Sequence, residues 1–269
     1  MHGLGNDFVV LDRISYPEIE MTGALAEQLG HRQFWIGCDQ ILIIEPSLTE
    51  DFRYRIYNQD GSEVEMCGNG ARCFLQYVRD KWLTAKHEVR VEIAKWVIIL
   101  RTDGKNITVD MWSPIFRDDL IPVKQWVRDI TVEGRTFNFI PVSMGNPHAV
   151  IFLDESVKNF AVPRYGRPIE ICVDIFPKKV NVEFVHVRSR THIDMRVWER
   201  WAWETLACGT GACASVVAGV MAGKLEKNMS IRVSLRGWDL YVSWSGHDGD
   251  SVIMSGPAVT VFDGEFIMN

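Results

Sequence analysis

The chain carries the same short motif twice, and the spacing of the two copies restricts how it folds. Cys67-Gly68-Asn69-Gly70-Ala71 and Cys208-Gly209-Thr210-Gly211-Ala212 lie 141 residues apart. Other matches recur at the same or nearly the same offset, as expected of an internal repeat. They are residues 55–58 with 196–199, Glu63 with Glu204, Gln40 with Asn181, and Gly5-Asn6 with Gly145-Asn146. Five nearly collinear matches indicate a duplication, so we predict two lobes of like topology.

Each lobe is predicted to be mostly β-structure around one helix. Short segments rich in Val, Ile and Phe alternate with turn residues, a pattern typical of strands. One convincing helix follows each cysteine motif, over residues 71–81 and 212–225, and both helices are apolar enough to be wrapped by the strands of their own lobe. The prediction is an α+β fold of two pseudo-symmetric lobes, residues 1–115 and 116–259. Each lobe is a mostly antiparallel sheet or barrel, with the active site in the cleft between the lobes.

Composition excludes several classes of partner. The 269 residues are 47% hydrophobic and 24% charged with a net charge of −6, which is ordinary for a globular protein with room for two lobes. Lys and Arg form no cluster that would track phosphates, so nucleic acid is not expected. Apolar runs such as 8–11 and 41–44 are too short to span a bilayer. No export signal follows Met1, and six cysteines make no dense disulfide framework, so we expect the reducing cytoplasm.

The repeated cysteines suggest acid–base chemistry at two helix N-termini. The positive end of a helix dipole lowers the pKa of a thiol, and the glycine N–H groups beside it form a nest for a carboxylate. If the lobes face each other, Cys67 and Cys208 approach one bound carbon from opposite sides. An epimerase needs this arrangement, because one group removes the Cα proton while another delivers a proton to the opposite face.

Amides at strand ends and one charged pair complete the predicted site. The amides are able to donate to a carboxylate and accept from an ammonium group. They are Asn6, Gln40, Asn58, Asn146 and Asn181. Where the first lobe has Asn58, the second has Glu199-Arg200. Arg200 is expected to bind a carboxylate bidentately, and Glu199 to take an ammonium group or tune a thiol. Different charges on a symmetric scaffold indicate a substrate whose two ends differ.

The motifs together resemble those of the diaminopimelate epimerase family over nearly the whole chain. The blocks that carry the resemblance are residues 1–8, 58–62, 66–73, 144–148 and 207–212. The resemblance implies interconversion of LL- and meso-2,6-diaminopimelate, without pyridoxal phosphate or metal, in the synthesis of lysine and of peptidoglycan precursors. It also implies a homodimer and a C-terminal strand, at about residues 260–269, that returns to the first lobe. A few strand residues usually precede the segment that begins here at Met1.

The resemblance also assigns roles to individual residues. Cys67 and Cys208 are the acid–base pair, and His148 and Glu199 modulate the thiols. The residues implied to bind substrate are Asn6, Gln40, Asn58, Gly68, Asn69, Asn146, Asn181, Glu199, Arg200, Gly209 and Thr210.

Other interpretations of the same residues remain open. Cys67 with Cys73, or Cys208 with Cys213, would be metal ligands of unusual spacing, since zinc sites favour a two-residue knuckle. We expect Cys73 and Cys213 in the core. Cys38 and Cys172 are expected to be buried and inert. His148 is alternatively a strand-end histidine bonded to backbone, and Glu63 and Glu204 are alternatively caps of the loops before the helices. The competing functions are a two-cysteine racemase for another amino acid and an inactive binding protein on this scaffold.

Tryptophan is unusually frequent and occupies turn positions. The chain has 10 Trp but 6 Tyr, and seven of the tryptophans stand where the resemblance places glycine. They are Trp35, Trp82, Trp96, Trp112, Trp201, Trp203 and Trp238. Each is expected at a positive φ, where a bulky side chain costs about 1–2 kcal/mol. Our hypothesis is that the source reads UGA as glycine and that these codons were translated as tryptophan. Trp198 and Trp244, in contrast, are expected to be native, and real Trp201 and Trp203 would crowd the site.

Overall fold

The chain forms two compact units. A computed structural model describes residues 1–64, 67–94, 96–117, 120–124 and 126–266. The first unit is Met1–Val109 with the segment from Gly256 onward, and the second is Asp110–Ser255. The predicted α+β fold with two lobes is confirmed. Within the described residues, no helix combines the length and the apolar character needed to cross a membrane.

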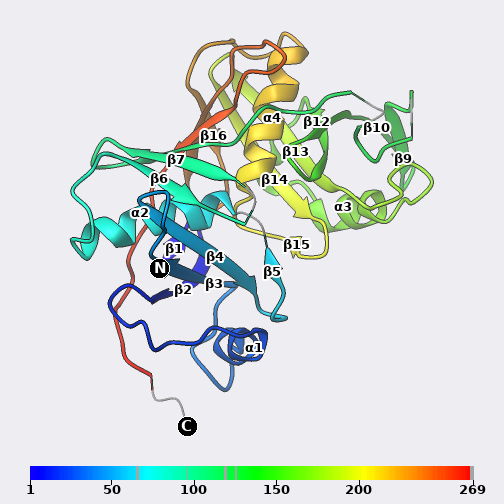
Figure 1. Cartoon of the computed structure of the whole chain (residues 1–269). Coiled ribbons are helices and arrows are strands. Elements are labelled where there is room, and N and C mark those ends of the chain that lie inside the picture. Colours follow the sequence, from blue (N-terminus) through cyan, green and yellow to red (C-terminus); the bar gives the residue numbers. More distant parts are fainter. Residues whose placement is uncertain (65–66, 95, 118–119, 125, 267–269) are drawn as a thin grey trace. The chain divides into compact units, whose positions relative to one another are not determined.

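The first unit is a mixed sheet with two helices (Figure 1). Its strands follow the order β1-β2-β3-β4-β6-β7-β8, with β5 beside β4. The strands are β1 (His2–Gly3), β2 (Asn6–Asp12), β3 (Gln40–Glu45), β4 (Phe52–Asn58), β5 (Glu63–Val64), β6 (Glu88–Glu92), β7 (Val97–Thr102) and β8 (Ile107–Asp110). The helices are α1 (Gly23–Gly30) and α2 (Gly68–Asp80).

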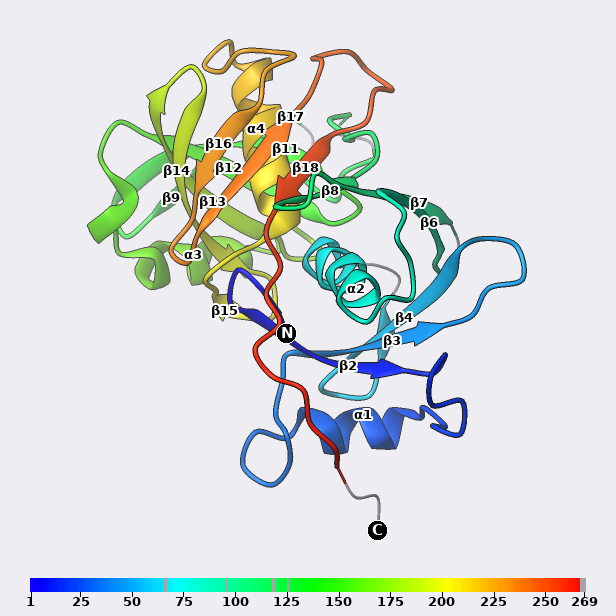
Figure 2. The same cartoon turned by 90° about the vertical axis from the view of Figure 1, so that its left-hand side faces the viewer.

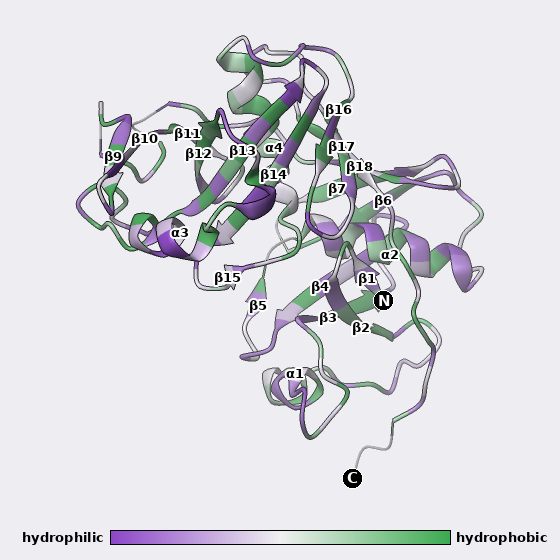
Figure 3. Cartoon of the chain, turned by 180° about the vertical axis from the view of Figure 1, so that it is seen from behind, coloured by the Kyte–Doolittle hydropathy of each residue, from purple (hydrophilic) through white to green (hydrophobic). Residues whose placement is uncertain are grey.

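The second unit contains the order β11-β12-β13-β14-β16-β17-β18, with β15 beside β14 and a separate pair of β9 and β10. The strands are β9 (Asp129–Val132), β10 (Arg135–Asn138), β11 (Ile140–Ser143), β12 (Pro147–Leu153), β13 (Asn181–Ser189), β14 (His192–Glu199), β15 (Trp203–Glu204), β16 (Ile231–Ser234), β17 (Asp239–Ser243) and β18 (Ile253–Gly256). The helices are η1 (Val157–Asn159), α3 (Val162–Glu170) and α4 (Gly209–Met221). Hydrophobic and hydrophilic residues alternate along β14, as expected of a strand with one buried face, whereas the first five residues of β13 are all buried (Figure 3).

The main sheets of the two units agree strand for strand in topology, although the β9–β10 pair belongs to the second unit alone among the described residues. β2 and β3 are parallel, as are β12 and β13, while the β3–β4 and β13–β14 pairs are antiparallel. Registers agree too. Phe8 pairs with Gln40 in the first unit, and His148 pairs with Asn181 in the second. The offset read from the sequence therefore reports true structural correspondence, so residues of the two units are comparable position by position.

The central helix of each unit lies against its own sheet. Figure 2 looks nearly along α2, with the strands of the first unit around it. α2 and α4 begin at Gly68 and Gly209, three residues before the predicted starts, because the glycines of the motif adopt helical geometry. Both motif cysteines are N-cap residues with extended backbone. Cys73 and Cys213 are fully buried in these helices, as predicted.

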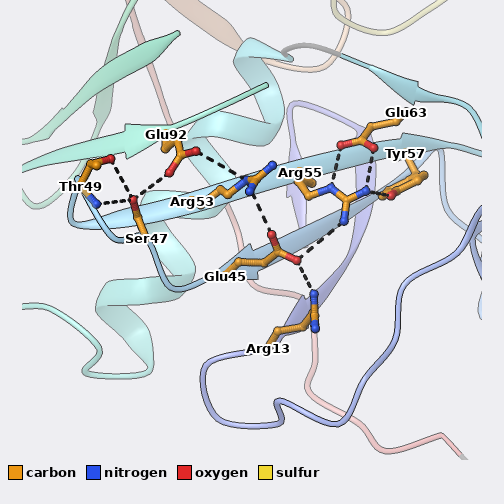
Figure 4. Close-up of polar contacts among 9 residues, drawn as sticks. All are labelled: Arg13, Glu45, Ser47, Thr49, Arg53, Arg55, Tyr57, Glu63 and Glu92. Carbon is orange, nitrogen blue, oxygen red and sulfur yellow. Dashed lines mark hydrogen bonds and ion pairs between the residues drawn. The ribbon is translucent and has the colours of Figure 1, made fainter. Parts of the chain in front are cut away.

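Paired arginines and glutamates support the turns that lead to the helices. Arg55 binds Glu63 at 2.7 Å from Nε to Oε1, and Arg196 binds Glu204 in the same way at 2.8 Å. Glu63 and Glu204 thus bind arginine side chains of the adjacent strands. In the first unit the network extends to Glu45, whose carboxylate lies 2.5 Å from Nη1 of Arg13 and 3.8 Å from Nε of Arg53 (Figure 4).

The C-terminal segment closes the first unit. The backbone amide of His2 donates to the carbonyl of Val259 at 2.9 Å, and Val259 donates back at 3.0 Å. The buried guanidinium of Arg72 donates to the carbonyl of Pro257 at 3.2 Å. Residues from both ends of the chain thus share one core.

The two central helices end in the same motif with different residues. After α4, Gly223 has a φ of +67°, and the amides of Gly223 and Lys224 donate to the carbonyls of Val220 and Gly219. After α2, Trp82 has a φ of +59°, and the equivalent amides donate to Arg79 and Val78. This is the Schellman arrangement, whose left-handed position favours glycine. Trp82 lies 141 residues before Gly223, so tryptophan occupies the glycine position of the repeat.

Left-handed backbone is concentrated at tryptophans. Among the non-glycine residues that the structure describes, nine have positive φ, and five of these are Trp. Four were predicted, namely Trp82, Trp112, Trp201 and Trp203, and Trp126 was not. The prediction of positive φ is wrong for Trp35, Trp96 and Trp238, which are not among these nine residues. Trp198 and Trp244 are buried core residues, as expected of native tryptophans.

Candidate active site

Cys67 lies at the start of α2 in a half-buried position. Its Sγ lies 3.7 Å from Oδ1 of Asn6, so the thiol donates to an amide oxygen. Its backbone amide donates to the hydroxyl of Tyr54 at 3.3 Å. Asn69 donates to the same oxygen of Asn6 at 3.2 Å. The first unit therefore brings together three of the predicted residues, Asn6, Cys67 and Asn69.

The orientation of Asn6 is fixed from the other side. Its Nδ2 donates to Asp39 at 3.0 Å, which turns Oδ1 toward Cys67. Arg32 bridges Asp7 and Asp39, at 2.8 and 2.7 Å respectively. The Arg32 guanidinium holds the pKa of Asp7 below its usual range despite the opposing effect of burial, which is the largest single contribution. The two other predicted amides of this unit bind each other, with Gln40 donating to Asn58 at 2.9 Å.

Cys208 lies at the start of α4 and is buried. The amide of Gly211 donates to its Sγ at 3.4 Å, and the hydroxyl of Thr210 lies 3.5 Å from the sulfur. Burial raises the pKa of the Cys208 thiol well above its usual value, and the carboxylates of Glu199 and Glu183 raise it further. The sequence had predicted a lowered pKa from the helix dipole. The buried setting, which depends on tertiary packing, has the opposite and larger effect.

The charged pair of the second unit is divided between two environments. Glu199 contacts the Cys208 thiol and accepts a hydrogen bond from the hydroxyl of Thr205, and its burial raises its pKa. The backbone amide of Arg200 donates to Oδ1 of Asn181 at 2.9 Å, while its guanidinium donates to the carbonyl of Lys178 at 3.1 Å. Glu199 therefore lies at the thiol, and Arg200 points along a neighbouring loop.

A buried pair beneath Cys208 includes one residue that the sequence analysis missed. Nδ1 of His148 lies 2.7 Å from Oε1 of Glu183, and Nε2 lies 2.9 Å from Oδ1 of Asn146. Asn146 in turn donates to Thr210 at 3.3 Å. Both ring nitrogens of His148 thus contact side chains, so the alternative of a strand-end histidine bonded to backbone is wrong. The signal that would have revealed Glu183 is its match, at the offset of 141, with apolar Leu42.

Each unit presents the same chemical elements. They are a sulfur at a helix N-terminus, glycine residues at the first turn of the helix, and amides at the ends of adjacent strands. Such groups exchange one proton and bind an anion. Cys38 and Cys172 were both expected to be buried. Cys38 is buried, whereas Cys172 is only half-buried.

Known proteins match almost the whole chain. A family model described as diaminopimelate epimerase matches residues 1–116 and 140–261. A diaminopimelate epimerase of Azoarcus sp. is 49% identical over 98% of this chain and 96% of its own length. That of Laribacter hongkongensis is 47% identical over 100% and 98%, respectively.

Solved structures share the fold at low sequence identity. A PhzF-family phenazine biosynthesis protein of Bacillus anthracis superposes with a TM-score of 0.72 at 16% identity, covering 100% of this chain and 95% of its own. A probable proline racemase of Agrobacterium radiobacter K84 gives a TM-score of 0.67 at 14% identity, covering 92% and 81%. These two similarities concern architecture alone.

Proposed function

Because the chain belongs to the diaminopimelate epimerase family, we propose that it interconverts LL- and meso-2,6-diaminopimelate by a Cα proton transfer that uses Cys67 and Cys208. One observation carries the mechanism: both cysteines are N-cap residues of matching helices in two units of the same topology. A duplicated scaffold that keeps one sulfur per copy supplies the two groups that a two-base reaction needs.

The proposed reaction needs one thiolate and one thiol. The thiolate takes the Cα proton and becomes a thiol, and the other thiol donates its proton to the opposite face of the carbanion. The raised pKa of Cys208 means that this residue rests as the thiol and is the proton donor when Cys67 is the base. After turnover the protonation states are exchanged, so the pair titrates as a coupled system. All proton transfers in this scheme use side chains of the chain itself.

Substrate recognition is assigned to the amides and to the charged pair. Diaminopimelate has two amino-acid ends, of which only one reacts. We assign the reacting end to the helix N-termini, where Gly68, Asn69, Gly209 and Thr210 offer backbone N–H groups to its carboxylate. Asn6, Gln40, Asn58, Asn146 and Asn181 are assigned to the ammonium and carboxylate groups. Glu199 and Arg200 give the second unit the charge that distinguishes the two ends.

The proposal extends to the cell and the assembly. We place the reaction in the cytoplasm, as a step toward lysine and peptidoglycan precursors, and we propose a homodimer. Sedimentation equilibrium of the purified chain measures the assembly directly, and a mass of one chain at micromolar concentration would contradict the dimer.

Hydrogen exchange in deuterated water tests the activity. We expect the chain to replace the α-proton of diaminopimelate with deuterium and to leave proline unchanged. Exchange of proline but not diaminopimelate would instead support the alternative racemase, and absence of exchange with all amino acids would support the binding protein. Cys67→Ala and Cys208→Ala are each expected to abolish epimerisation, because each removes the proton carrier for one face.

Two cysteines in the same helices provide the matched control. Cys73→Ala and Cys213→Ala remove buried sulfurs that face the core. These variants are expected to lower stability and keep turnover. An equal loss of turnover in a folded Cys73→Ala variant would contradict the assignment of Cys67.

A further inference from the structure

We propose that Glu183 is a positioning residue that acts on Cys208 through a hydrogen-bonded chain of His148, Asn146 and Thr210. This inference rests on the proposed two-thiol reaction and adds a residue outside the predicted site. The chain of contacts is continuous: 2.7 Å from Glu183 to His148, 2.9 Å to Asn146, 3.3 Å to Thr210 and 3.5 Å to the sulfur.

The contact between Glu183 and His148 is fully buried. The side chains of Glu183 and His148 are both 0% exposed. A carboxylate in such a place needs a charged or strongly polar partner, and the contact to Nδ1 supplies it. Among the described residues, the second oxygen of Glu183, Oε2, has no hydrogen-bond partner. The carboxylate is therefore held by a single interaction, and His148 is the residue that interaction orients.

Both ring nitrogens of His148 face oxygen atoms. Nδ1 faces the carboxylate of Glu183, and Nε2 faces Oδ1 of Asn146, whose amide nitrogen is directed at Thr210. The carboxylate of Glu183 accepts from the ring N–H at Nδ1, and this contact fixes the plane of the ring. Glu183 thus orients His148, and His148 orients the Asn146 amide that reaches Thr210.

Glu183 also touches the start of α4 directly. A Cβ atom placed on Gly211 would lie 2.8 Å from Oε1 of Glu183 and 3.3 Å from Sγ of Cys208. The amide of Gly211 donates to that same sulfur. The absence of a side chain at Gly211 therefore lets the carboxylate approach the helix turn that holds the thiol. The groups that interact with Cys208 are Glu199 from β14, Glu183 from β13, and Thr210 and Gly211 from α4.

The first unit has apolar residues at the positions that correspond to His148 and Glu183. At the positions of His148 and Glu183 it has Phe8 and Leu42, which are 3% and 0% exposed. A Cβ atom on Gly70, the equivalent of Gly211, would lie 3.3 Å from the ring of Phe8. An apolar pair therefore satisfies this fold. Since the polar pair is not required for packing, we assign it to the chemistry of Cys208.

The double variant His148→Phe/Glu183→Leu tests this assignment by copying the first unit's pair into the second. We expect it to fold, and we expect kcat to fall by at least about 10-fold, typical for loss of an acid–base contribution, while KM changes little. Glu183→Gln keeps the shape of the side chain and removes its charge. For this variant too we expect kcat to fall while KM changes little. A kcat within threefold of wild type in folded Glu183→Gln would overturn the proposal.

Nuclear magnetic resonance of the histidine rings gives a second readout, independent of activity. In wild-type protein labelled with ¹⁵N-histidine, we expect the Nδ1–H of His148 to give a hydrogen-bonded ring signal, and Glu183→Gln to shift or remove that signal. The His148→Phe variant assigns the signals. An Nδ1–H signal that is unchanged in Glu183→Gln would overturn the contact and with it the proposed chain. If wild type fails to exchange diaminopimelate, the proposed function fails, whereas the ring signals still test Glu183.

Glu45→Gln is the matched control. Glu45 is also a carboxylate in a mostly buried strand, but it lies at the far end of β3 and binds Arg13. Its replacement is expected to lower stability without changing the His148 signals or kcat. Equal loss of kcat in both variants would show that any buried carboxylate has this effect and would contradict a specific role of Glu183.

Discussion

Oδ1 of Asn6 lies 3.7 Å from Sγ of Cys67, and the same amide donates from Nδ2 to Asp39. Asp39 thereby fixes which end of the amide faces the sulfur. The thiol of the first unit thus lies beside a neutral oxygen, whereas Cys208 lies beside carboxylates. The two thiols of the proposed pair differ in charge environment although their helices match.

Asn6→Asp is predicted to impair the reaction at neutral pH. A carboxylate in place of the amide oxygen disfavours a thiolate on Cys67, because like charges repel at this distance. We expect kcat/KM to fall at least about 10-fold at pH 7 and to recover partly at higher pH, as the thiolate forms. Asn138→Asp, on the exposed end of β10, is the control for an added charge. A pH profile identical to wild type would contradict the contact of Asn6 with the thiol.

Arg200→Lys is predicted to weaken substrate binding. Lysine keeps the charge but lacks the planar fork that binds a carboxylate bidentately. We expect KM for diaminopimelate to rise by about 10-fold or more and kcat to change less. Arg190→Lys, at an exposed pair with Glu226, is the control. A normal KM would mean that Arg200 serves only to bind the carbonyl of Lys178.

Stability is predicted to decrease at alkaline pH. Burial raises the pKa of Cys38 to about 11 and that of Cys73 to about 12, and it raises the pKa of Cys208 as well. Above the usual thiol value of about 9, the unfolded chain loses protons that the folded chain retains, so the free energy of unfolding falls as pH rises. Denaturant titrations from pH 8 to 11 measure this slope. Cys73→Ala is expected to reduce it, and stability that rises over this range would contradict the prediction.

Mild oxidation is predicted to inactivate the chain by joining Cys67 to Cys208. This prediction rests on the proposed reaction, because two thiols that address opposite faces of one carbon are candidates for the Cα separation of roughly 7 Å or less that a disulfide needs. We expect dithiothreitol to restore activity and bound substrate to protect. Peptide mapping identifies the product. Recovery of both peptides uncrosslinked from fully inactivated protein would contradict the proposal that the thiols face each other.

Trp82→Gly is predicted to stabilise the chain. The residue after α2 adopts a left-handed conformation that costs about 1–2 kcal/mol for a residue with a side chain, and glycine removes this cost. The repeat provides the reverse experiment, since Gly223→Trp adds the same cost after α4. Denaturant unfolding is expected to show a gain for the first change and a loss for the second. A loss of stability in Trp82→Gly would contradict a glycine position.

The codons test the origin of these tryptophans. We propose that Trp82, Trp112, Trp126, Trp201 and Trp203 are glycine in the source organism, through UGA codons read as glycine, because all five have left-handed backbone. Trp35, Trp96 and Trp238 belong to the same hypothesis without that structural support. Sequencing of the gene and the intact mass of the native protein decide it. UGG codons at the five positions would contradict the proposal.

The two-lobe architecture could be predicted from the sequence because an internal repeat extends over most of the chain. Five matches at nearly the same offset as Cys67 and Cys208 predicted two lobes of like topology, and the segment after each cysteine motif predicted the central helices. Helix starts were placed late, since Gly68 and Gly209 by themselves indicate turns and become helical only against their sheets. Local propensity carries no information about that packing.

Contacts between distant segments were beyond the sequence. Glu183 lies in an apolar run and would ordinarily be assigned to an exposed edge, yet its partner His148 lies 35 residues earlier on the adjacent strand. The raised pKa of Cys208 has the same origin, because the burial of the sulfur and its distance from Glu199 arise from packing. The position of Cys208 at a helix N-terminus could be predicted from the sequence. The burial that raises the pKa of its thiol could not.

The pairing of His2 with Val259 has a consequence for the order in which the chain is completed on the ribosome. Residues 1–109 are synthesised first, but their core includes the contact of Arg72 with Pro257 and the pairing of β1 with the C-terminal segment. The second unit, in contrast, is one uninterrupted stretch from Asp110 to Ser255. The first unit, although its N-terminal part is synthesised first, therefore gains its contacts with the C-terminal segment only after all residues of the second unit have been synthesised.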